Sequence, residues 1–239
     1  MARVAVITGA AGGIGRATVD LFRSEGWYAV GIDRIFEGVG SSDRFLQADV
    51  ADEDSLKAVF ESLEDLGQID ALVNNAAVSQ STRLIDMTSA EWDELMAVNL
   101  RGAFLATRYA HALMRERGGA IVNVSSVHAI ATAVGVAAYA TSKGALVALT
   151  RASALELAAD GIRVNAVLPG AVDTPMLQGE GDHAERIRSL SARTPLGRVA
   201  EPREIAQAIL FLSDPLRSSF ITGEAMAVDG GALAKLSSE

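Results

Sequence analysis

Residues 4–15 read Val-Ala-Val-Ile-Thr-Gly-Ala-Ala-Gly-Gly-Ile-Gly, and this stretch decides the fold. A short, continuously apolar run such as Val4–Ile7 is typical of a strand covered by helices on both faces. The glycines that follow, spaced T-G-x-x-x-G-x-G, let the backbone approach a phosphate closely, and a helix N-terminus beyond them offers free N–H groups. The stretch therefore predicts a strand, a phosphate-binding turn and a helix over residues 13–25.

The acid that follows this turn is Asp33, at the end of the next apolar run and 18 residues beyond Gly15. A carboxylate there can accept hydrogen bonds from the ribose hydroxyls of a dinucleotide and repels a 2′-phosphate. The common G-x-G-x-x-G fingerprint is not met, because Thr18 occupies the third glycine position counted from Gly13. A glycine-rich turn needed only for packing, followed by a capping aspartate, is the alternative interpretation. We predict cofactor contacts from Gly9, Gly13, Ile14, Gly15 and Asp33.

Apolar runs and amphipathic stretches alternate along the rest of the chain, which indicates repeated β-α-β units. The predicted strands are Val4–Ile7, Tyr28–Ile32, Phe45–Gln47, Ala71–Val73, Ala120–Val124, Arg163–Leu168 and Ala225–Val228. Further helices are predicted from a Thr88/Glu91 capping box to Met114, over 137–159, and from Pro202 to Leu212, with Asp52 as the cap of another. The stretch Met176–Ala200, with its Gly179-Glu180-Gly181-Asp182 run, is expected to be a loop or lid. No linker divides the chain, so one domain over residues 1–239 is predicted.

Composition excludes several classes of protein. The 239 residues are 49% hydrophobic, which is enough for a sizeable core, and the absence of cysteine excludes disulfides and thiolate metal sites. A net charge of −9 argues against a nucleic-acid-binding protein. No apolar stretch has the roughly 18 residues of a membrane span, and no leader precedes the first strand, so we expect a cytoplasmic protein without membrane partners. The three histidines lack metal-ligand spacing, so no metal site is predicted.

A second sequence motif is Tyr139-Ala140-Thr141-Ser142-Lys143. Residues four apart share one face of a helix, so the phenol of Tyr139 and the ammonium of Lys143 can serve one site. A nearby cation favours the phenolate and lowers the tyrosine pKa from about 10, which gives a usable general acid/base. Ser126, at the end of a predicted strand, could hydrogen-bond the same substrate oxygen. An exposed helix face is the alternative for the Tyr/Lys pair taken alone.

Together, these motifs with Asn74-Asn75-Ala76 and Pro169-Gly170 resemble the short-chain dehydrogenase/reductase family, over nearly the whole chain. The resemblance implies a doubly wound, Rossmann-type parallel sheet of about seven strands, a nicotinamide cofactor and hydride transfer at a carbinol or carbonyl carbon. It makes Tyr139 the general acid/base, Lys143 its partner and a ligand of the nicotinamide ribose, and Ser126 the residue that orients the substrate oxygen. Asn99 resembles the asparagine that holds a water linked to Lys143.

The remaining cofactor contacts also come from this resemblance. They are Asp49 and Val50 at the adenine, Asn75 and Ala76 beside its ribose, and Pro169, Val172 and Thr174 at the carboxamide, besides Tyr139 and Lys143. The family often has N-N-A-G where this chain has Ala77, and that change is expected to cost little. NAD is predicted over NADP because Asp33 faces the ribose, although Arg34 beside it could attract a phosphate.

The substrate implied is a small or medium secondary alcohol or its ketone, with oxidation as the direction expected with NAD. Two other functions stay open at this point. One is an NADPH-dependent 3-oxoacyl-thioester reductase, and the other is a catalytically silent dinucleotide-sensing protein on the same fold. Family helices corresponding to residues 89–114 and 137–159 pair across a two-fold axis. We therefore predict a homotetramer, with a homodimer as the alternative.

Overall fold

A computed structural model describes residues 2–36, 42–178 and 182–235. Its strands are β1 (Val4–Thr8), β2 (Tyr28–Asp33), β3 (Arg44–Gln47), β4 (Ala71–Asn74), β5 (Gly119–Val124), β6 (Ile162–Pro169) and β7 (Ala225–Val228). All seven predicted strands are confirmed, each to within one residue at either end. They form one sheet in which every pair of neighbours is parallel.

The order of the strands locates the functional end of the sheet. The order is β3-β2-β1-β4-β5-β6-β7, so the chain builds outward from β1 in one direction and then outward from β4 in the other. In doubly wound sheets ligands bind at the carboxyl ends of the strands, where this reversal opens a crevice. The turns after β1 and β4 therefore flank the expected site.

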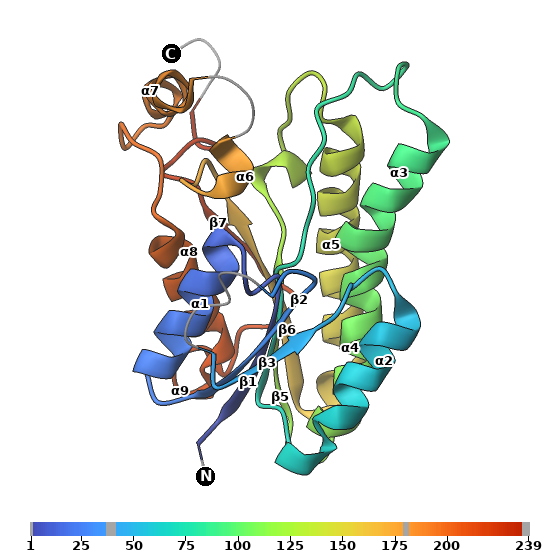
Figure 1. Ribbon diagram of the computed structural model, residues 1–239. Coiled ribbons are helices and arrows are strands. Elements are labelled where there is room, and N and C mark those ends of the chain that lie inside the picture. Colours follow the sequence, from blue (N-terminus) through green and yellow to red (C-terminus); the bar gives the residue numbers. More distant parts are fainter. Residues whose placement is uncertain (1, 37–41, 179–181, 236–239) are drawn as a thin grey trace.

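Helices cover both faces of the sheet (Figure 1). One layer contains α2 (Glu53–Ser62), α3 (Ser89–Met96), α4 (Gly102–Met114) and α5 (Ala137–Glu156); the other contains α1 (Gly13–Ser24), α8 (Pro202–Ser213) and α9 (Pro215–Ser218). Two more, α6 (Pro175–Gln178) and α7 (His183–Arg193), follow the carboxyl end of β6. Short 3₁₀ turns lie at Glu64–Leu66, Val127–Ala129 and Ala158–Asp160. The predicted doubly wound α/β architecture is confirmed.

The ends of the predicted helices have identifiable causes. Gly26 follows α1 with φ of +81°, a conformation that favours glycine, and Gly161 follows the end of α5 and its 3₁₀ turn with φ of +68°. Thr88 and Glu91 form the predicted reciprocal capping box at the start of α3. Asp52 caps α2 by accepting hydrogen bonds from Asp54 N and Ser55 N.

Two expectations were wrong. The helix predicted from residue 89 to Met114 is not continuously α-helical, because Ala97–Arg101 forms a π-helical turn between α3 and α4. The stretch Met176–Ala200, expected to be a loop or lid without a helix of its own, contains the 11-residue helix α7. Its N-terminus is fixed by Asp182, whose carboxylate accepts hydrogen bonds from the amides of the first turn. Residues 179–181 of the Gly-Glu-Gly-Asp run lie outside the described residues.

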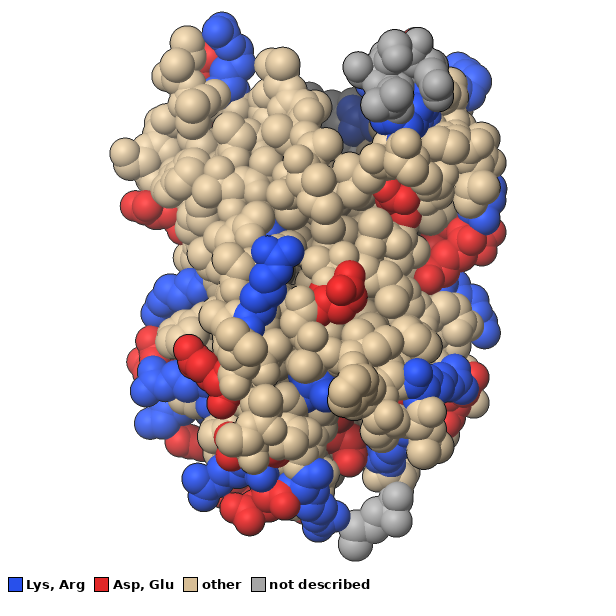
Figure 2. Space-filling model, turned by 180° about the vertical axis from the view of Figure 1, so that it is seen from behind, with Lys and Arg blue, Asp and Glu red and all other residues tan. Residues whose placement is uncertain are grey.

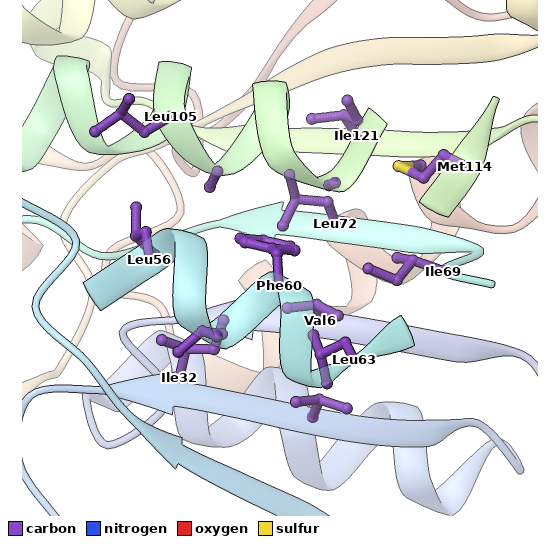
Figure 3. Close-up of a cluster of buried hydrophobic side chains, with 14 of the residues drawn as sticks. Val6, Ile32, Leu56, Phe60, Leu63, Ile69, Leu72, Leu105, Met114 and Ile121 are labelled. Carbon is purple, nitrogen blue, oxygen red and sulfur yellow. The ribbon is translucent and has the colours of Figure 1, made fainter. Parts of the chain in front are cut away.

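The core on the α2 and α4 side of the sheet is shown in Figure 3. One apolar cluster contains Leu56 and Phe60 of α2, Leu63 directly after it, Leu105 of α4 and the buried strand residue Leu72. These five side chains are at most 3% exposed. Burying a large apolar side chain stabilises the fold by about 1.5–3 kcal/mol, so this cluster makes α2 and α4 a firm layer behind the strand ends. Within the described ranges, no helix is long and apolar enough to cross a membrane.

Candidate active site

A cavity of about 710 Å³ opens where β1, β4, β5 and β6 end. Most of the predicted site residues line it, and they come from these four strand ends, from the ends of β2 and β3, and from α5. The predicted residues in its wall are Gly9, Gly13, Ile14, Asp33, Asp49, Val50, Asn75, Ala76, Ser126, Tyr139, Lys143, Pro169, Val172 and Thr174. Two predicted residues, Gly15 and Asn99, are not in its wall. The order of strands thus brings distant motifs to one cavity.

The glycine-rich turn is held against the end of β4. Gly9 has φ of +67°, and a Cβ there would lie 2.8 Å from Ala76 Cα. A Cβ on Gly15 would overlap the Gly9 carbonyl oxygen, so Gly15 is needed for the packing of the turn on its own helix. Asn75 Nδ2 donates to the carbonyls of Thr8 and Gly9, both at 3.0 Å. The turn therefore has one fixed shape at the mouth of the cavity.

The donors and acceptors at this end suit a dinucleotide. Gly12 precedes α1 and no side chain caps that helix, so its first N–H groups are available to an anion such as a pyrophosphate. Asp33 Oδ2 accepts a hydrogen bond from Ala11 N at 2.9 Å, and Oδ1 accepts one from Ile35 N at 3.0 Å. The carboxylate is held in the cavity wall with lone pairs remaining for ribose hydroxyls.

Three polar side chains, those of Ser126, Tyr139 and Lys143, lie in the cavity wall at the carboxyl end of β5 and in α5. Ser126 follows β5 in an extended conformation and is 6% exposed. Lys143, 2% exposed, donates from Nζ to the Val124 carbonyl at 2.8 Å, and the same Nζ lies 5.6 Å from the centroid of the Tyr139 ring. The His128 ring meets the Tyr139 ring edge-on, with centroids 5.8 Å apart. Phenol, hydroxyl and ammonium thus share one wall of the cavity.

Burial controls the charges of this group. It raises the pKa of the Tyr139 phenol, and the Ser126 hydroxyl lowers that pKa by less. It lowers the pKa of Lys143 from 10.5 to about 8 and also lowers the pKa of His128. The expected lowering of the Tyr139 pKa is therefore not found in this structure, because desolvation of the phenolate outweighs the groups around it.

Asn99 lies behind the cavity wall, in the π-helical turn. Its Oδ1 accepts from Val78 N at 2.8 Å, and its Nδ2 donates to the Val78 carbonyl and to Ser142 Oγ at 2.9 and 3.1 Å. Val78 lines the cavity, and Ser142 lies next to Lys143 in α5. The Asn99 side chain therefore ties the segment after β4 to the helix that carries Tyr139. π-Helical turns are frequent at functional sites.

The sequence indicates a loop or lid over Met176–Ala200, but it does not indicate the helix α7 or which of its residues line the cavity. Leu190, Arg193 and Thr194 line the cavity together with Met176 and Leu177 of α6. The signal was weak because α7 is polar overall and none of its residues is buried. Its position over the cavity depends on tertiary packing that the sequence does not display. Within residues 2–36, 42–178 and 182–235 there is no group of three side chains that could hold a metal ion.

Comparison with known proteins agrees with this geometry. The profile of a family described as "Enoyl-(Acyl carrier protein) reductase" matches residues 9–232. The chain is 41% identical over 241 residues to a 3-oxoacyl-[acyl-carrier-protein] reductase of Thermotoga maritima, covering 96% of this chain and 97% of the relative. It is 39% identical over 242 residues to a cis-4-hydroxycyclohexanecarboxylate dehydrogenase of Sinomonas cyclohexanicum, covering 96% of each.

The similarity extends to solved structures. The ligand-free aldohexose dehydrogenase of Thermoplasma acidophilum superposes with a TM-score of 0.94 at 33% identity, covering 99% of this chain and 96% of that one. Sequence, strand order and cavity therefore agree in one assignment. This chain is an oxidoreductase of the short-chain dehydrogenase/reductase family.

Proposed function

We propose that this protein is an NAD-dependent dehydrogenase that transfers a hydride between NAD and a small or medium secondary alcohol or its ketone. The observation that carries the proposal is the convergence, in one cavity, of the Asp33 carboxylate at one end and Ser126, Tyr139 and Lys143 at the other. In this proposal residues 1–239 form one domain that both binds the dinucleotide and catalyses the reaction. The other cofactor contacts are those predicted from the sequence, with Gly15 and Asn99 acting through packing and hydrogen bonds.

The roles of the residues follow from their chemistry. In oxidation the carbinol C–H bond breaks with its electron pair, and bound NAD supplies the acceptor of that hydride. Tyr139, as phenolate, takes the hydroxyl proton, and Ser126 hydrogen-bonds the same oxygen so that it is oriented toward the phenol. Lys143 stabilises the phenolate as a nearby cation. Asn99 fixes the position of the segment at Val78 relative to α5 through its hydrogen bonds to Val78 and Ser142.

NAD is favoured over NADP by the position of Asp33. Its two oxygens are held by backbone N–H groups in the wall of the cavity, so the carboxylate cannot swing away from an adenosine ribose without losing both hydrogen bonds. A 2′-phosphate placed there would meet like charge. Arg34 lines the same end of the cavity, and its cation offsets part of this repulsion.

A second candidate activity is the NADPH-dependent reduction of 3-oxoacyl thioesters. The observation that favours it is the 41% identity to a 3-oxoacyl-[acyl-carrier-protein] reductase. Asp33 argues against it, because that reaction needs the phosphorylated cofactor at the end of β2. A cyclic alcohol bearing a carboxylate, as in the name of the 39% identical relative, is compatible with the first candidate.

Homotetramer formation is part of the proposal, with a homodimer as the alternative. On the α3–α4 face, Met96, Ala97, Leu100 and Phe104 surround a shallow apolar depression. Among the described residues, the strand β7 pairs only with β6, so its other edge offers backbone groups for pairing. Figure 2 views the side opposite β3 and shows wide areas without charged side chains. The α3–α4 face and the free edge of β7 both suit self-association by two-fold symmetry.

The test is a panel of secondary alcohols and ketones, read by nicotinamide absorbance with both cofactors. The proposal predicts NADH formation from at least one cyclic or linear secondary alcohol, with NAD the more efficient cofactor. Acetoacetyl thioesters with NADPH are the competing substrates in the same assay. Faster turnover of the thioester than of every alcohol would favour the second candidate and refute the first.

A further inference from the structure

The helix α7 brings a cation into the end of the cavity where the substrate is expected. Arg193, its last residue, lines the cavity with Leu190 of the same helix and with Leu177 of α6. Ser126 and Tyr139 lie in the wall of the same cavity. In Figure 2, basic side chains lie around the hollow at the upper end of the molecule, on the side of α7.

The other charged groups of the cavity have evident tasks. Asp33 and Arg34 lie at the end of β2, and Asp49 follows β3 and accepts a hydrogen bond from Ala51 N at 2.8 Å. Lys143 donates to the Val124 carbonyl beside Tyr139. Among the described residues, no acidic side chain lines the cavity from α6, α7 or the 3₁₀ turn after Ser126. An anion at that end would therefore meet Arg193 without a neighbouring carboxylate.

Arg193 also differs from Arg198, the next arginine toward the C-terminus. Arg198 makes two hydrogen bonds of 2.7 Å to the Glu204 carboxylate, which occupy its guanidinium. In the part of the chain that the structure describes, Arg193 makes no ion pair, hydrogen bond or cation–π contact. A planar guanidinium with free donors beside apolar walls suits the two oxygens of one carboxylate.

We infer that the substrate is a hydroxy acid whose carboxylate is bound by Arg193 while its carbinol lies at Ser126 and Tyr139. This inference rests on the proposed function and narrows its substrate class. A single arginine suits a monocarboxylate better than a phosphate dianion or a polycarboxylate, which usually require several cations. Met176 and Leu177 supply apolar surface for the carbon skeleton between the two polar ends.

The test compares cis-4-hydroxycyclohexanecarboxylate with its methyl ester, which keeps the ring and the carbinol but removes the charge. In the native protein the acid should have the higher kcat/KM. Arg193→Gln should lower kcat/KM for the acid by about 10- to 100-fold, the range that one charge-assisted pair supplies, and for the ester by less than about threefold. Arg193→Lys should recover part of the loss, because it restores the charge without the planar fork.

The matched control is Arg188→Gln, on the same helix but outside the cavity wall. This variant removes the same charge from the protein and should leave kcat/KM for the acid and for the ester unchanged. Raising the ionic strength from about 0.02 to about 0.5 M should reduce the advantage of the acid in the native protein but not in Arg193→Gln. Equal losses for acid and ester in Arg193→Gln would overturn the inference, because they would indicate a structural role.

A binding measurement separates this inference from the proposed function. Calorimetry with cyclohexanecarboxylate, which has no carbinol to oxidise, should show binding to the native protein in the presence of NAD and weaker binding to Arg193→Gln. The affinity for NAD alone should be the same in both proteins. A weaker NAD affinity in Arg193→Gln would assign the arginine to the cofactor and refute the inference. Absence of any alcohol oxidation would refute the proposed function alone.

Discussion

Asp33 Oδ2 accepts a hydrogen bond from Ala11 N at 2.9 Å, which joins the end of β2 to the glycine-rich turn after β1. Asp33 and Ala11 are 22 residues apart in the sequence, so this carboxylate connects two distant segments and has two tasks. It fixes the turn that is proposed to receive the pyrophosphate, and it presents a negative charge where the adenosine ribose is proposed to lie. Substitutions at Asp33 are expected to alter both the shape of the turn and the choice of cofactor.

Asp33→Asn should narrow the preference for NAD over NADP, because it removes the charge and keeps an oxygen that can accept from Ala11 N. We expect the ratio of kcat/KM values to fall by about 10- to 100-fold. Asp33→Ser should reduce the preference for NAD by a similar factor. It should also lower the melting temperature, because the hydrogen bonds from Ala11 N and Ile35 N to the carboxylate are lost. Steady-state kinetics with both cofactors tests this. Equal use of NAD and NADP by the unmutated enzyme would show that Arg34 already neutralises Asp33.

Gly15→Ala should destabilise the protein by roughly 1–3 kcal/mol, the usual cost of overpacking. The new Cβ would overlap the Gly9 carbonyl oxygen, so the turn must move. Gly144→Ala is the matched control, because it lies inside α5 and its Cβ would have its nearest neighbour, the Ala129 carbonyl oxygen, at 3.9 Å. That variant should be as stable as the native protein or more so. Urea titrations measure both, and similar stabilities for the two variants would contradict the packing argument.

Lys143→Met should change stability in a pH-dependent way. Burial lowers the folded-state pKa of Lys143 from 10.5 to about 8, so burying the ammonium costs stability below pH 8. The cost is relieved as pH rises from about 8 to 10.5, because the unfolded chain then binds more protons than the folded one. The difference in free energy of unfolding, Lys143→Met minus native protein, should therefore be larger at pH 7 than at pH 10, by up to roughly 3 kcal/mol.

Urea titrations at pH 7 and pH 10 check this difference. Tyr139 is present in both proteins, so its titration contributes to both curves. A stability difference that is the same at the two pH values would mean that Lys143 keeps an ordinary pKa in the folded protein. The variant should also lose most of its turnover, because the cation beside the phenol is removed.

The proposed assembly can be tested by light scattering at micromolar concentration. We expect four times the mass of one chain for the native protein. Phe104 is 46% exposed in the apolar depression of the α3–α4 face, so Phe104→Glu should reduce the mass by placing a charge in the interface. A native protein with the mass of a single chain would contradict the assembly.

Much of the fold was predictable because its signals are local. Each strand is a short apolar run bounded by a turn, and the parallel arrangement follows from runs that are apolar throughout. The motifs at Gly9, Ser126 and Tyr139 each end a strand or begin a helix, so their shared location in one cavity follows from the order of the strands.

Other features depend on contacts between distant segments. The π-helical turn at Ala97–Arg101 interrupts an otherwise regular helical pattern, and no local residue type marks it. The helix α7 is polar overall and has no buried residue, so its sequence carries few of the apolar residues that mark a helix packed on the sheet. The raised pKa of Tyr139 reflects desolvation by the folded protein, whereas the spacing of Tyr139 and Lys143 indicates only the favourable cation.

The central claim is that Tyr139 exchanges the proton while the hydride moves to NAD. The most direct measurement is turnover of NAD with a secondary alcohol by the native protein and by Tyr139→Phe, together with the NAD affinity of each. We predict that Tyr139→Phe loses on the order of 10²-fold or more in kcat and binds NAD within a few-fold of the native affinity. Native turnover should rise with pH as the phenol ionises. Near-normal turnover in Tyr139→Phe would contradict the account.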